Sequence, residues 1–195
     1  EKLLEGYVQD AEEILLGVYE KQKEYMAEAA YFLGEINNSR YEILNAIEWY
    51  ESAVKLEPNN IIYLISLVEN KLWFDSDKSI KSLREGLKII ETSEPMTEAS
   101  LFILEKKASS YSNEKNYILS IPIREFILRH FKSVFNLNRA AQVAHSLGSD
   151  FFLQGIKKES RIYLFESLRM CISSGSNSDL IIPIDSLATL CIERK

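Results

Sequence analysis

The side chains with the most varied chemistry in this chain are two histidines and two cysteines, and their spacing predicts no metal centre. His130 and His145 are far apart and have no cysteine pair nearby, whereas zinc sites use closely spaced histidine and cysteine ligands. Cys171 and Cys191 fall within apolar helical patterns, which favours buried thiols that pack as small hydrophobic groups. The sequence neither requires nor excludes a disulfide between them. We therefore expect no metal and no cofactor.

Asp75 and Asp77 resemble a cation-binding pair, but their position favours a structural role. They precede a helical pattern, where an aspartate accepts hydrogen bonds from the first free N–H groups of a helix. No glycine-rich phosphate loop, no HExxH motif and no nucleophile elbow occurs in the chain. We therefore predict that the protein is not an enzyme. His145 is interpreted first as a polar surface residue, and second as a partner contact or proton-transfer group.

Residues 27–60 contain the clearest pattern of elements that could position side chains. Two amphipathic helical segments are separated by a polar turn. In the second segment, Ala46, Tyr50 and Ala53 share one face, because residues three and four apart lie together on a helix. Gly34 in the first segment and Ala46 in the second are small enough to let two antiparallel helices approach closely.

This layout resembles a tetratricopeptide repeat, a helix-turn-helix unit of about 34 residues. The residues that match the family pattern are Ala30, Leu33, Gly34, Ala46, Tyr50, Ala53 and Pro58. Two residues depart from it, since Ala30 replaces the usual tryptophan and Asn37 replaces an aromatic residue. The resemblance implies an all-α fold, in which antiparallel helix pairs form a right-handed α-α superhelix.

The rest of the chain follows the same period with less complete motifs. We predict a partial repeat or capping helix at 1–26, repeats at 61–94 and 137–175, a degenerate repeat at 95–136 and a terminal helix at 176–195. The small-large-small faces of the second helices are Ser79, Leu83 and Gly86 in one repeat, and Ser160, Leu164 and Ser167 in another. Leu147, Gly148 and Phe151 match the first helix of the latter. In the degenerate repeat we expect a loop at 112–115 and a helix from about Ser120 to Phe135, with Pro122 in its first turn.

Both ends of the predicted array look unfinished. Ala11, Leu15 and Val18 have the spacing of a second helix, which makes residues 1–7 the tail of a mostly absent first helix. Residues 179–193 are apolar nearly all round, whereas the last helix of a repeat array normally has a polar outer face. We therefore expect a fragment of a longer chain, or self-association through this last helix.

Composition restricts the partners. The 195 residues are 46% hydrophobic and 27% charged, which is sufficient for a continuous core, and the net charge of −6 argues against nucleic-acid binding. No apolar stretch is long enough to span a membrane and no signal peptide is seen, so we expect a cytoplasmic protein.

The resemblance also implies a concave groove formed by the first helix of each repeat. The positions that contact ligands in the family correspond here to Glu28, Tyr31, Glu35, Asn38, Ile65, Glu69, Trp73, Gln142, His145 and Phe152. Because Glu28, Glu35 and Glu69 would repel an acidic segment, we expect the partner to be a protein or peptide that is basic or apolar rather than acidic.

These observations favour a protein-interaction scaffold that binds a peptide or partner segment in this groove. One alternative is a regulatory sensor domain of a longer, peptide-responsive regulator. A catalytic role similar to that of phosphatases related to such regulators is a third hypothesis, for which the sequence offers no specific residue.

Overall fold

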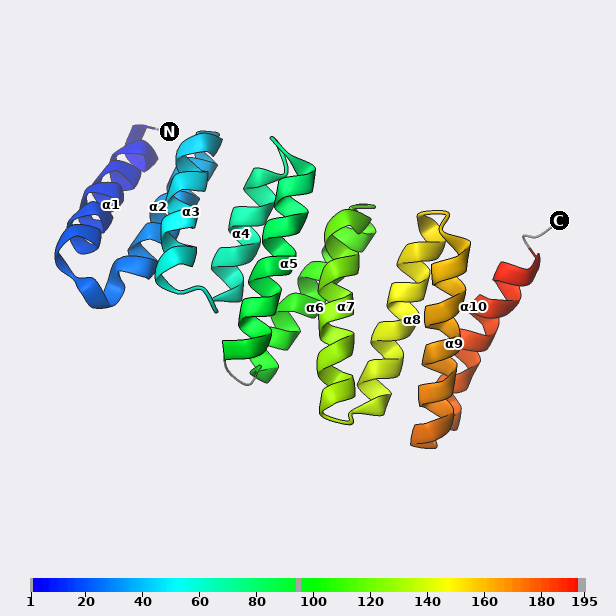
Figure 1. Cartoon of the computed structure of the whole chain (residues 1–195). Coiled ribbons are helices and arrows are strands. Elements are labelled where there is room, and N and C mark those ends of the chain that lie inside the picture. The colour runs from blue at the N-terminus through cyan, green and yellow to red at the C-terminus, as the bar shows by residue number, and fades with distance from the viewer. Residues whose placement is uncertain (1, 94–95, 193–195) are drawn as a thin grey trace. The chain divides into compact units, whose positions relative to one another are not determined.

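The computed structural model describes residues 2–93 and 96–192, and over these residues it is all-α and contains no strand. The chain forms two compact units, Glu1–Met96 and Thr97–Lys195, called unit 1 and unit 2 below. Within each unit, every helix packs against the next one along the chain, as Figure 1 shows. The predicted all-α fold of consecutive antiparallel helix pairs, consistent with a helical repeat protein, is thereby confirmed.

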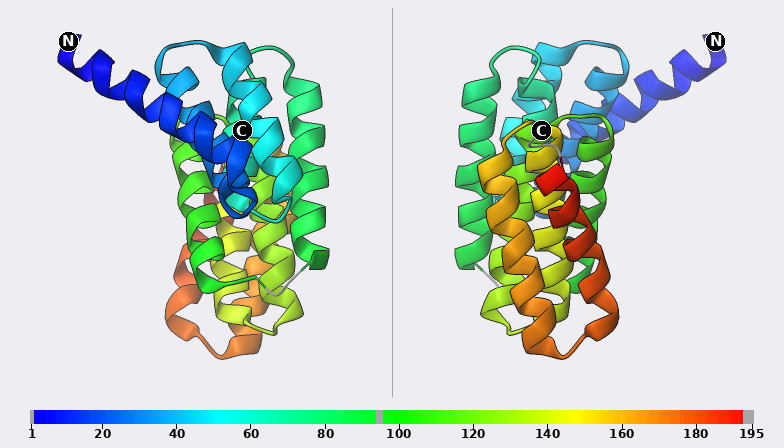
Figure 2. Two further views of the ribbon diagram at one scale, coloured as in Figure 1. Left: turned by 90° about the vertical axis from the view of Figure 1, so that its left-hand side faces the viewer. Right: turned by 90° about the vertical axis from the view of Figure 1, so that its right-hand side faces the viewer.

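Unit 1 begins with a long helix that lies against the first helix pair. Its elements are α1 (Lys2–Lys21), the 3-10 helix η1 (Lys23–Tyr25), α2 (Met26–Ser39), α3 (Ile43–Leu56), α4 (Ile61–Lys71) and α5 (Ser76–Ser93). The N-terminal part of α1 extends past α2 and α3 (Figure 2), and Tyr7 on it is exposed. Because α1 is one continuous helix, the prediction that residues 1–7 belong to a separate preceding helix is wrong for residues 2–7.

Unit 2 contains two helix pairs and a shorter final helix. Its elements are α6 (Glu98–Asn113), α7 (Tyr117–Ser133), α8 (Leu137–Leu153), α9 (Lys157–Ser174), the 3-10 helix η2 (Asn177–Leu180) and α10 (Ile181–Ile192). The predicted terminal helix is thus divided, and its residues 193–195 lie outside the described part of the chain. On α10, Pro183 and Leu190 are buried, so only part of this apolar helix is covered.

Small residues stand where paired helices approach most closely, as the sequence predicts. A methyl group added to Gly34 would lie 2.5 Å from Cε1 of Tyr50, and one added to Gly86 would lie 2.5 Å from Cδ1 of Leu64. A methyl group on Gly148 would lie 2.8 Å from Cγ of Leu164. These distances are well below van der Waals contact, so each pair depends on the absence of a side chain at its glycine. The predicted buried faces of α3, α5 and α9 are confirmed, since Ala46, Tyr50, Ala53, Ser79, Leu83, Ser160, Leu164 and Ser167 are all buried.

Short polar side chains begin several of the helices. Asp75 Oδ1 accepts a hydrogen bond of 3.0 Å from the backbone N–H of Lys78, which confirms its predicted capping role at the start of α5. Asp77 lies in the first turn of α5, where the positive end of the helix dipole stabilises its negative charge. Thr97 and Asn136 cap α6 and α8 in the same way as Asp75 caps α5.

The helix α7 starts earlier than the sequence predicts. It begins at Tyr117 rather than near Ser120, so Pro122 lies inside the helix and beyond its first turn. A proline in a helix interior costs about 3 kcal/mol because it removes one backbone hydrogen bond and crowds the preceding turn. The neighbouring Leu119, Ile121 and Ile123 are all buried in unit 2, and this tertiary packing offsets the local cost. Likewise, α6 continues to Asn113 through part of the predicted loop.

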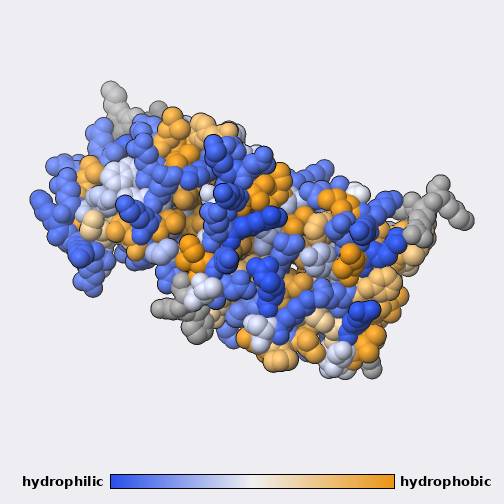
Figure 3. Space-filling view, viewed as in Figure 1, coloured by the Kyte–Doolittle hydropathy of each residue, from blue (hydrophilic) through white to orange (hydrophobic). Residues whose placement is uncertain are grey.

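Hydrophobic side chains are exposed at the end of unit 2 where α9 finishes and α10 begins. Figure 3 shows them in orange in its lower right part. Ile172, Ile181, Ile182 and Ile184 are each more than half exposed, at 62%, 71%, 57% and 52%. On an ordinary protein surface, exposed apolar residues are scattered singly. These branched aliphatic side chains instead form a group.

Candidate binding sites

The helices α2 and α4 bring several of the predicted groove residues together in unit 1. Tyr31 on α2 stacks on Tyr63 of α4, with ring centroids 4.9 Å apart and an angle of 25° between the rings. The Tyr31 ring also lies 6.0 Å from that of Tyr50 on α3. Glu35 follows Tyr31 by one helical turn and therefore shares its face. The charge of Glu69 on α4 is among the causes that raise the pKa of Tyr31, after burial.

A hydrogen bond joins one tyrosine of this face to a carboxylate. Tyr50 donates from its hydroxyl to Oε1 of Glu35 over 2.7 Å. Burial raises the pKa of Tyr31, and the charge of Glu35 raises it further. Glu35 thus accepts a hydrogen bond from the neutral Tyr50 phenol and keeps its negative charge at this face. We call this group the acidic tyrosine face; it consists of Glu28, Tyr31, Glu35, Ser66 and Glu69, together with the buried Tyr50 and Tyr63.

The pKa values of the three tyrosines are all raised. Burial is the largest cause for each of them. For Tyr50, the hydrogen bond to Glu35 and the charge of that carboxylate raise the pKa further. For Tyr63, burial together with the nearby charges of Glu57 and Glu28 raises the pKa to about 12. The phenols therefore stay neutral hydrogen-bond donors, and the carboxylates determine the charge of the face.

The other residues of unit 1 that were predicted to contact a partner, Asn38, Ile65 and Trp73, differ in how exposed they are. Asn38 is half-buried near the end of α2. Ile65 is only 3% exposed, so its prediction as a partner contact is wrong and it belongs to the core. The reason is that the apolar faces of α4 pack against both α3 and α5. Trp73 lies beyond the end of α4 and is 81% exposed.

In unit 2, the three predicted residues on α8 lie in different surroundings. Nε2 of His145 is hydrogen-bonded to Oγ of Ser186 on α10 over 2.9 Å, so the histidine contacts the last helix. Burial lowers the pKa of His145 below its ordinary value. Gln142 is exposed and lines a cavity formed with α6 and α7, and Phe152 is half-buried. The structure therefore does not gather these residues into one site.

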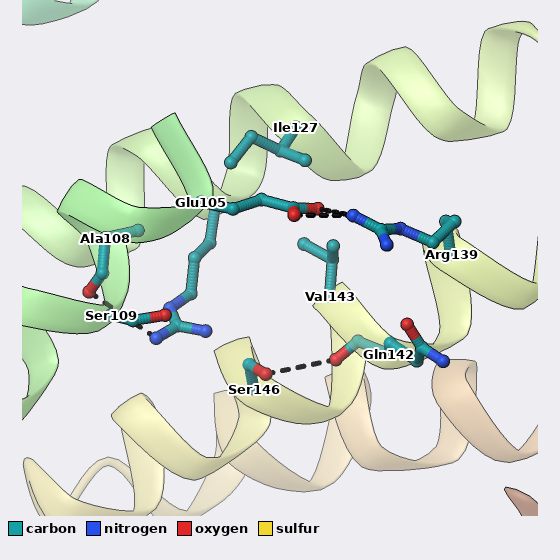
Figure 4. A pocket seen from close by; sticks show the side chains of 9 residues that line it. Glu105, Ala108, Ser109, Ile127, Arg139, Gln142, Val143 and Ser146 are labelled. Carbon is teal, nitrogen blue, oxygen red and sulfur yellow. Dashed lines mark hydrogen bonds and ion pairs between the residues drawn. The ribbon is translucent and has the colours of Figure 1, made fainter. Parts of the chain in front are cut away.

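The cavity at Gln142 has a volume of about 200 Å³. It is lined by Glu105, Ala108 and Ser109 of α6, Arg124 and Ile127 of α7, and Arg139, Gln142, Val143 and Ser146 of α8 (Figure 4), and we call it the Arg124 cavity. Nη2 of Arg139 lies 2.6 Å and 2.5 Å from the two carboxylate oxygens of Glu105. The hydroxyl of Ser146 donates to the backbone carbonyl of Gln142 over 3.1 Å. Polar side chains thus dominate its walls.

A buried ion pair behind this cavity was missed by the sequence reasoning. Nε of Arg124 lies 2.9 Å from Oδ2 of Asp150, whose side chain is 2% exposed. Ser112 and Ser120 donate their hydroxyls to the two oxygens of Asp150, over 2.5 Å and 2.8 Å. The residues come from α6, α7 and α8, so only the folded unit brings them together. The one available signal was an aspartate on the otherwise apolar face of α8 beside Leu147.

The cysteines and the acidic groups form no further centre in the described residues. Cys171 is buried as predicted, whereas Cys191 is exposed, and both are free thiols. Burial raises the pKa of Cys171, and the charge of Asp179 raises it further. Within residues 2–93 and 96–192, no group of three or more His, Cys, Asp or Glu side chains is arranged to hold a metal ion. None of the described helices is both long and apolar enough to cross a membrane.

Comparisons with known proteins leave the family open. No protein-family model matches the chain, and a search of the curated proteins finds no significant match.

Proposed function

We propose that the protein is a tetratricopeptide-like interaction module that binds a basic segment of a partner protein on the acidic tyrosine face. The observation that carries this proposal is the convergence of Tyr31, Glu35 and Glu69, three residues assigned to the groove from sequence position alone, on neighbouring helices. The family resemblance of residues 27–60 supports the same reading.

The chemistry of the face suits a segment that carries lysine or arginine. The carboxylates attract a cation by charge, and the half-buried ring of Tyr31 stabilises it through its π face. Tyr31 and Tyr63 already stack, so the aromatic surface is ordered before a partner arrives. A preordered surface loses less conformational entropy on binding than a mobile one.

The test is a direct comparison of peptides that differ in charge. An array of 12-residue peptides with stepwise changes from net negative to net positive charge is probed with the whole chain. We expect the retained peptides to be rich in lysine or arginine and binding to weaken as salt rises. The double variant Glu35→Gln, Glu69→Gln should lose them, while Glu48→Gln on the exposed side of α3 should not. Retention that ignores charge, or that survives the double variant, contradicts the proposal.

The exposed isoleucines around the start of α10 favour a second interaction. Ile181, Ile182 and Ile184 form an apolar surface, which we propose as a self-association surface of the kind expected from the sequence. Light scattering after gel filtration should show a concentration-dependent mass that the triple Ile→Ser variant lowers to that of one chain. A wild-type mass of one chain at all concentrations contradicts it.

A further inference from the structure

The charges around the Arg124 cavity are distributed unequally between its wall and the interior behind it. Arg124 and Arg139 both line the cavity, together with one carboxylate, that of Glu105. Asp150, the counter-ion of Arg124, is buried behind the wall and already accepts hydrogen bonds from two serine hydroxyls. Each guanidinium group of the wall is thus paired with one carboxylate, Arg139 with Glu105 and Arg124 with Asp150.

The guanidinium groups retain hydrogen-bonding capacity. A guanidinium has five N–H donors and no acceptor. For Arg124, the contacts are the ion pair with Asp150 and a long hydrogen bond of 3.4 Å from Nη2 to the carbonyl of Ala108. Arg139 contacts both oxygens of Glu105 through the single nitrogen Nη2. A group that supplies acceptor oxygens is the natural complement of such a wall, and a carboxylate matches the planar fork of an arginine.

A second cavity adjoins the first at Arg139 and is more apolar. It has a volume of about 390 Å³ and is lined by Glu98, Leu101, Phe102, Phe131, Asn136 and Arg139. The Arg139 guanidinium lies over the Phe131 ring, 5.3 Å from its centroid. Phe102 is 59% exposed, and the Lys106 ammonium lies over its ring, 5.4 Å from the centroid. Glu98, the one added carboxylate, is exposed at the first turn of α6, where water screens its charge.

We propose that unit 2 binds an apolar molecule that carries one carboxylate. The carboxylate lies between Arg124 and Arg139 in the first cavity, and the apolar part packs against Leu101, Phe102 and Phe131 in the second. The ligand is a free aromatic or branched aliphatic acid, or the C-terminal residue of a peptide, which presents the same two groups. This site is separate from the acidic tyrosine face and does not rest on the function proposed for that face.

The experiment uses two probes and their uncharged counterparts on the whole chain. The probes are 3-phenylpropanoate, as the free acid, and N-acetyl-Gly-Gly-Phe, as the peptide terminus; the controls are the corresponding amides. Binding is measured by calorimetry, and the side-chain amide of Gln142 in ¹H–¹⁵N spectra reports whether the ligand enters the Arg124 cavity. We expect at least one acid to bind about tenfold or more tightly than its amide, since charge-assisted hydrogen bonds are lost in the amide.

Two variants show whether a change in binding comes from the cavity itself or from a general disturbance of the fold. Arg139→Gln, on a partly exposed side chain, should weaken the acid about tenfold and leave the amide unchanged. Arg169→Gln, an exposed change on α9 away from both cavities, should leave both unchanged. Tighter binding of the free acid or of the peptide assigns the source of the ligand. Equal binding of acid and amide, no shift at Gln142, or an acid affinity that Arg139→Gln leaves intact overturns the proposal.

Discussion

Single small residues determine how closely the helices of each pair approach. Gly34, Gly86 and Gly148 each face a large side chain of the partner helix at a distance that leaves no room for a methyl group. Gly17 has no such role, because it lies within α1 and an added methyl group would have no atom of a neighbouring element within 4 Å. Replacement of glycine by alanine should therefore change stability in opposite directions at a close helix contact and at a position without one.

Substitution of Gly34 by alanine tests this contrast. The added methyl group would overlap the buried Tyr50 ring and force the α2–α3 pair apart, so we expect Gly34→Ala to lower the free energy of unfolding by about 1–3 kcal/mol. Gly17→Ala is the matched control, and it should raise stability by about 0.5–1 kcal/mol because alanine is the better helix former. Urea unfolding measures both changes. An unchanged urea midpoint for Gly34→Ala would show that α2 and α3 accommodate the added methyl group without loss of stability, which contradicts the prediction.

Asp150 gives a second prediction at this scale. Its replacement by alanine leaves Arg124 largely buried without its counter-ion, and Ser120 without its acceptor. We expect Asp150→Ala to lower the free energy of unfolding by about 3–5 kcal/mol, as breaking one side of a buried ion pair does. Asp185→Ala, an exposed carboxylate on α10, should change it by less than about 0.5 kcal/mol. Denaturant unfolding in which the two variants behave alike would argue against a structural role for the Asp150 network.

At the scale of elements, the contact between α8 and α10 depends on a histidine that stays neutral. Nε2 of His145 is hydrogen-bonded to Ser186, and burial holds its pKa below the ordinary value of 6.5. As the pH falls through 6.5, the unfolded chain takes up a proton that the folded chain still excludes. The contribution of His145 to stability is therefore present above pH 6.5 and is lost as the pH falls toward the lowered pKa.

The pH dependence of unfolding checks this sign. Between pH 7.5 and pH 5.5, wild type should lose more stability than His145→Gln, since glutamine keeps a hydrogen-bonding group without a proton to gain. His130→Gln serves as the second histidine control. Parallel pH profiles for wild type and His145→Gln would show that the histidine titrates equally in the folded and unfolded chain.

The helices could be predicted from the sequence because their signals are local. The candidate sites could be predicted only in part. The periodic apolar residues and the small residues Gly34, Gly86 and Gly148 lie within one or two elements. The assignment of Tyr31, Glu35 and Glu69 to a ligand-binding groove stays a prediction. The Arg124–Asp150 pair depends on the packing of three helices, which no local pattern reports. The interior position of Pro122 was missed for the same reason, because burial of its neighbours overrides the local preference of proline.

At the scale of the whole molecule, the chain is two compact units, each with its own buried residues. The close contacts of Gly34 lie in unit 1, and those of Gly148 lie in unit 2. In a repeat-like architecture each element contacts mainly its neighbours, so a local change should propagate over a short range.

Hydrogen exchange can follow this propagation. In Gly34→Ala, amides of α2, α3 and α4 should exchange faster, while those of α7, α8 and α9 should keep their wild-type protection. Gly148→Ala should give the converse pattern. A loss of protection in both units from either substitution would show that the whole chain opens as one cooperative body.

Both tryptophans of the chain, Trp49 and Trp73, belong to unit 1. Trp49 is half-buried and packs edge-on against Tyr19 with centroids 5.2 Å apart, whereas Trp73 is exposed. Emission excited at the red edge of the indole band therefore reports on unit 1 alone, while far-ultraviolet circular dichroism sums the helices of both units. Without any introduced label, the wild-type protein carries an optical reporter that distinguishes melting of one half from melting of the other.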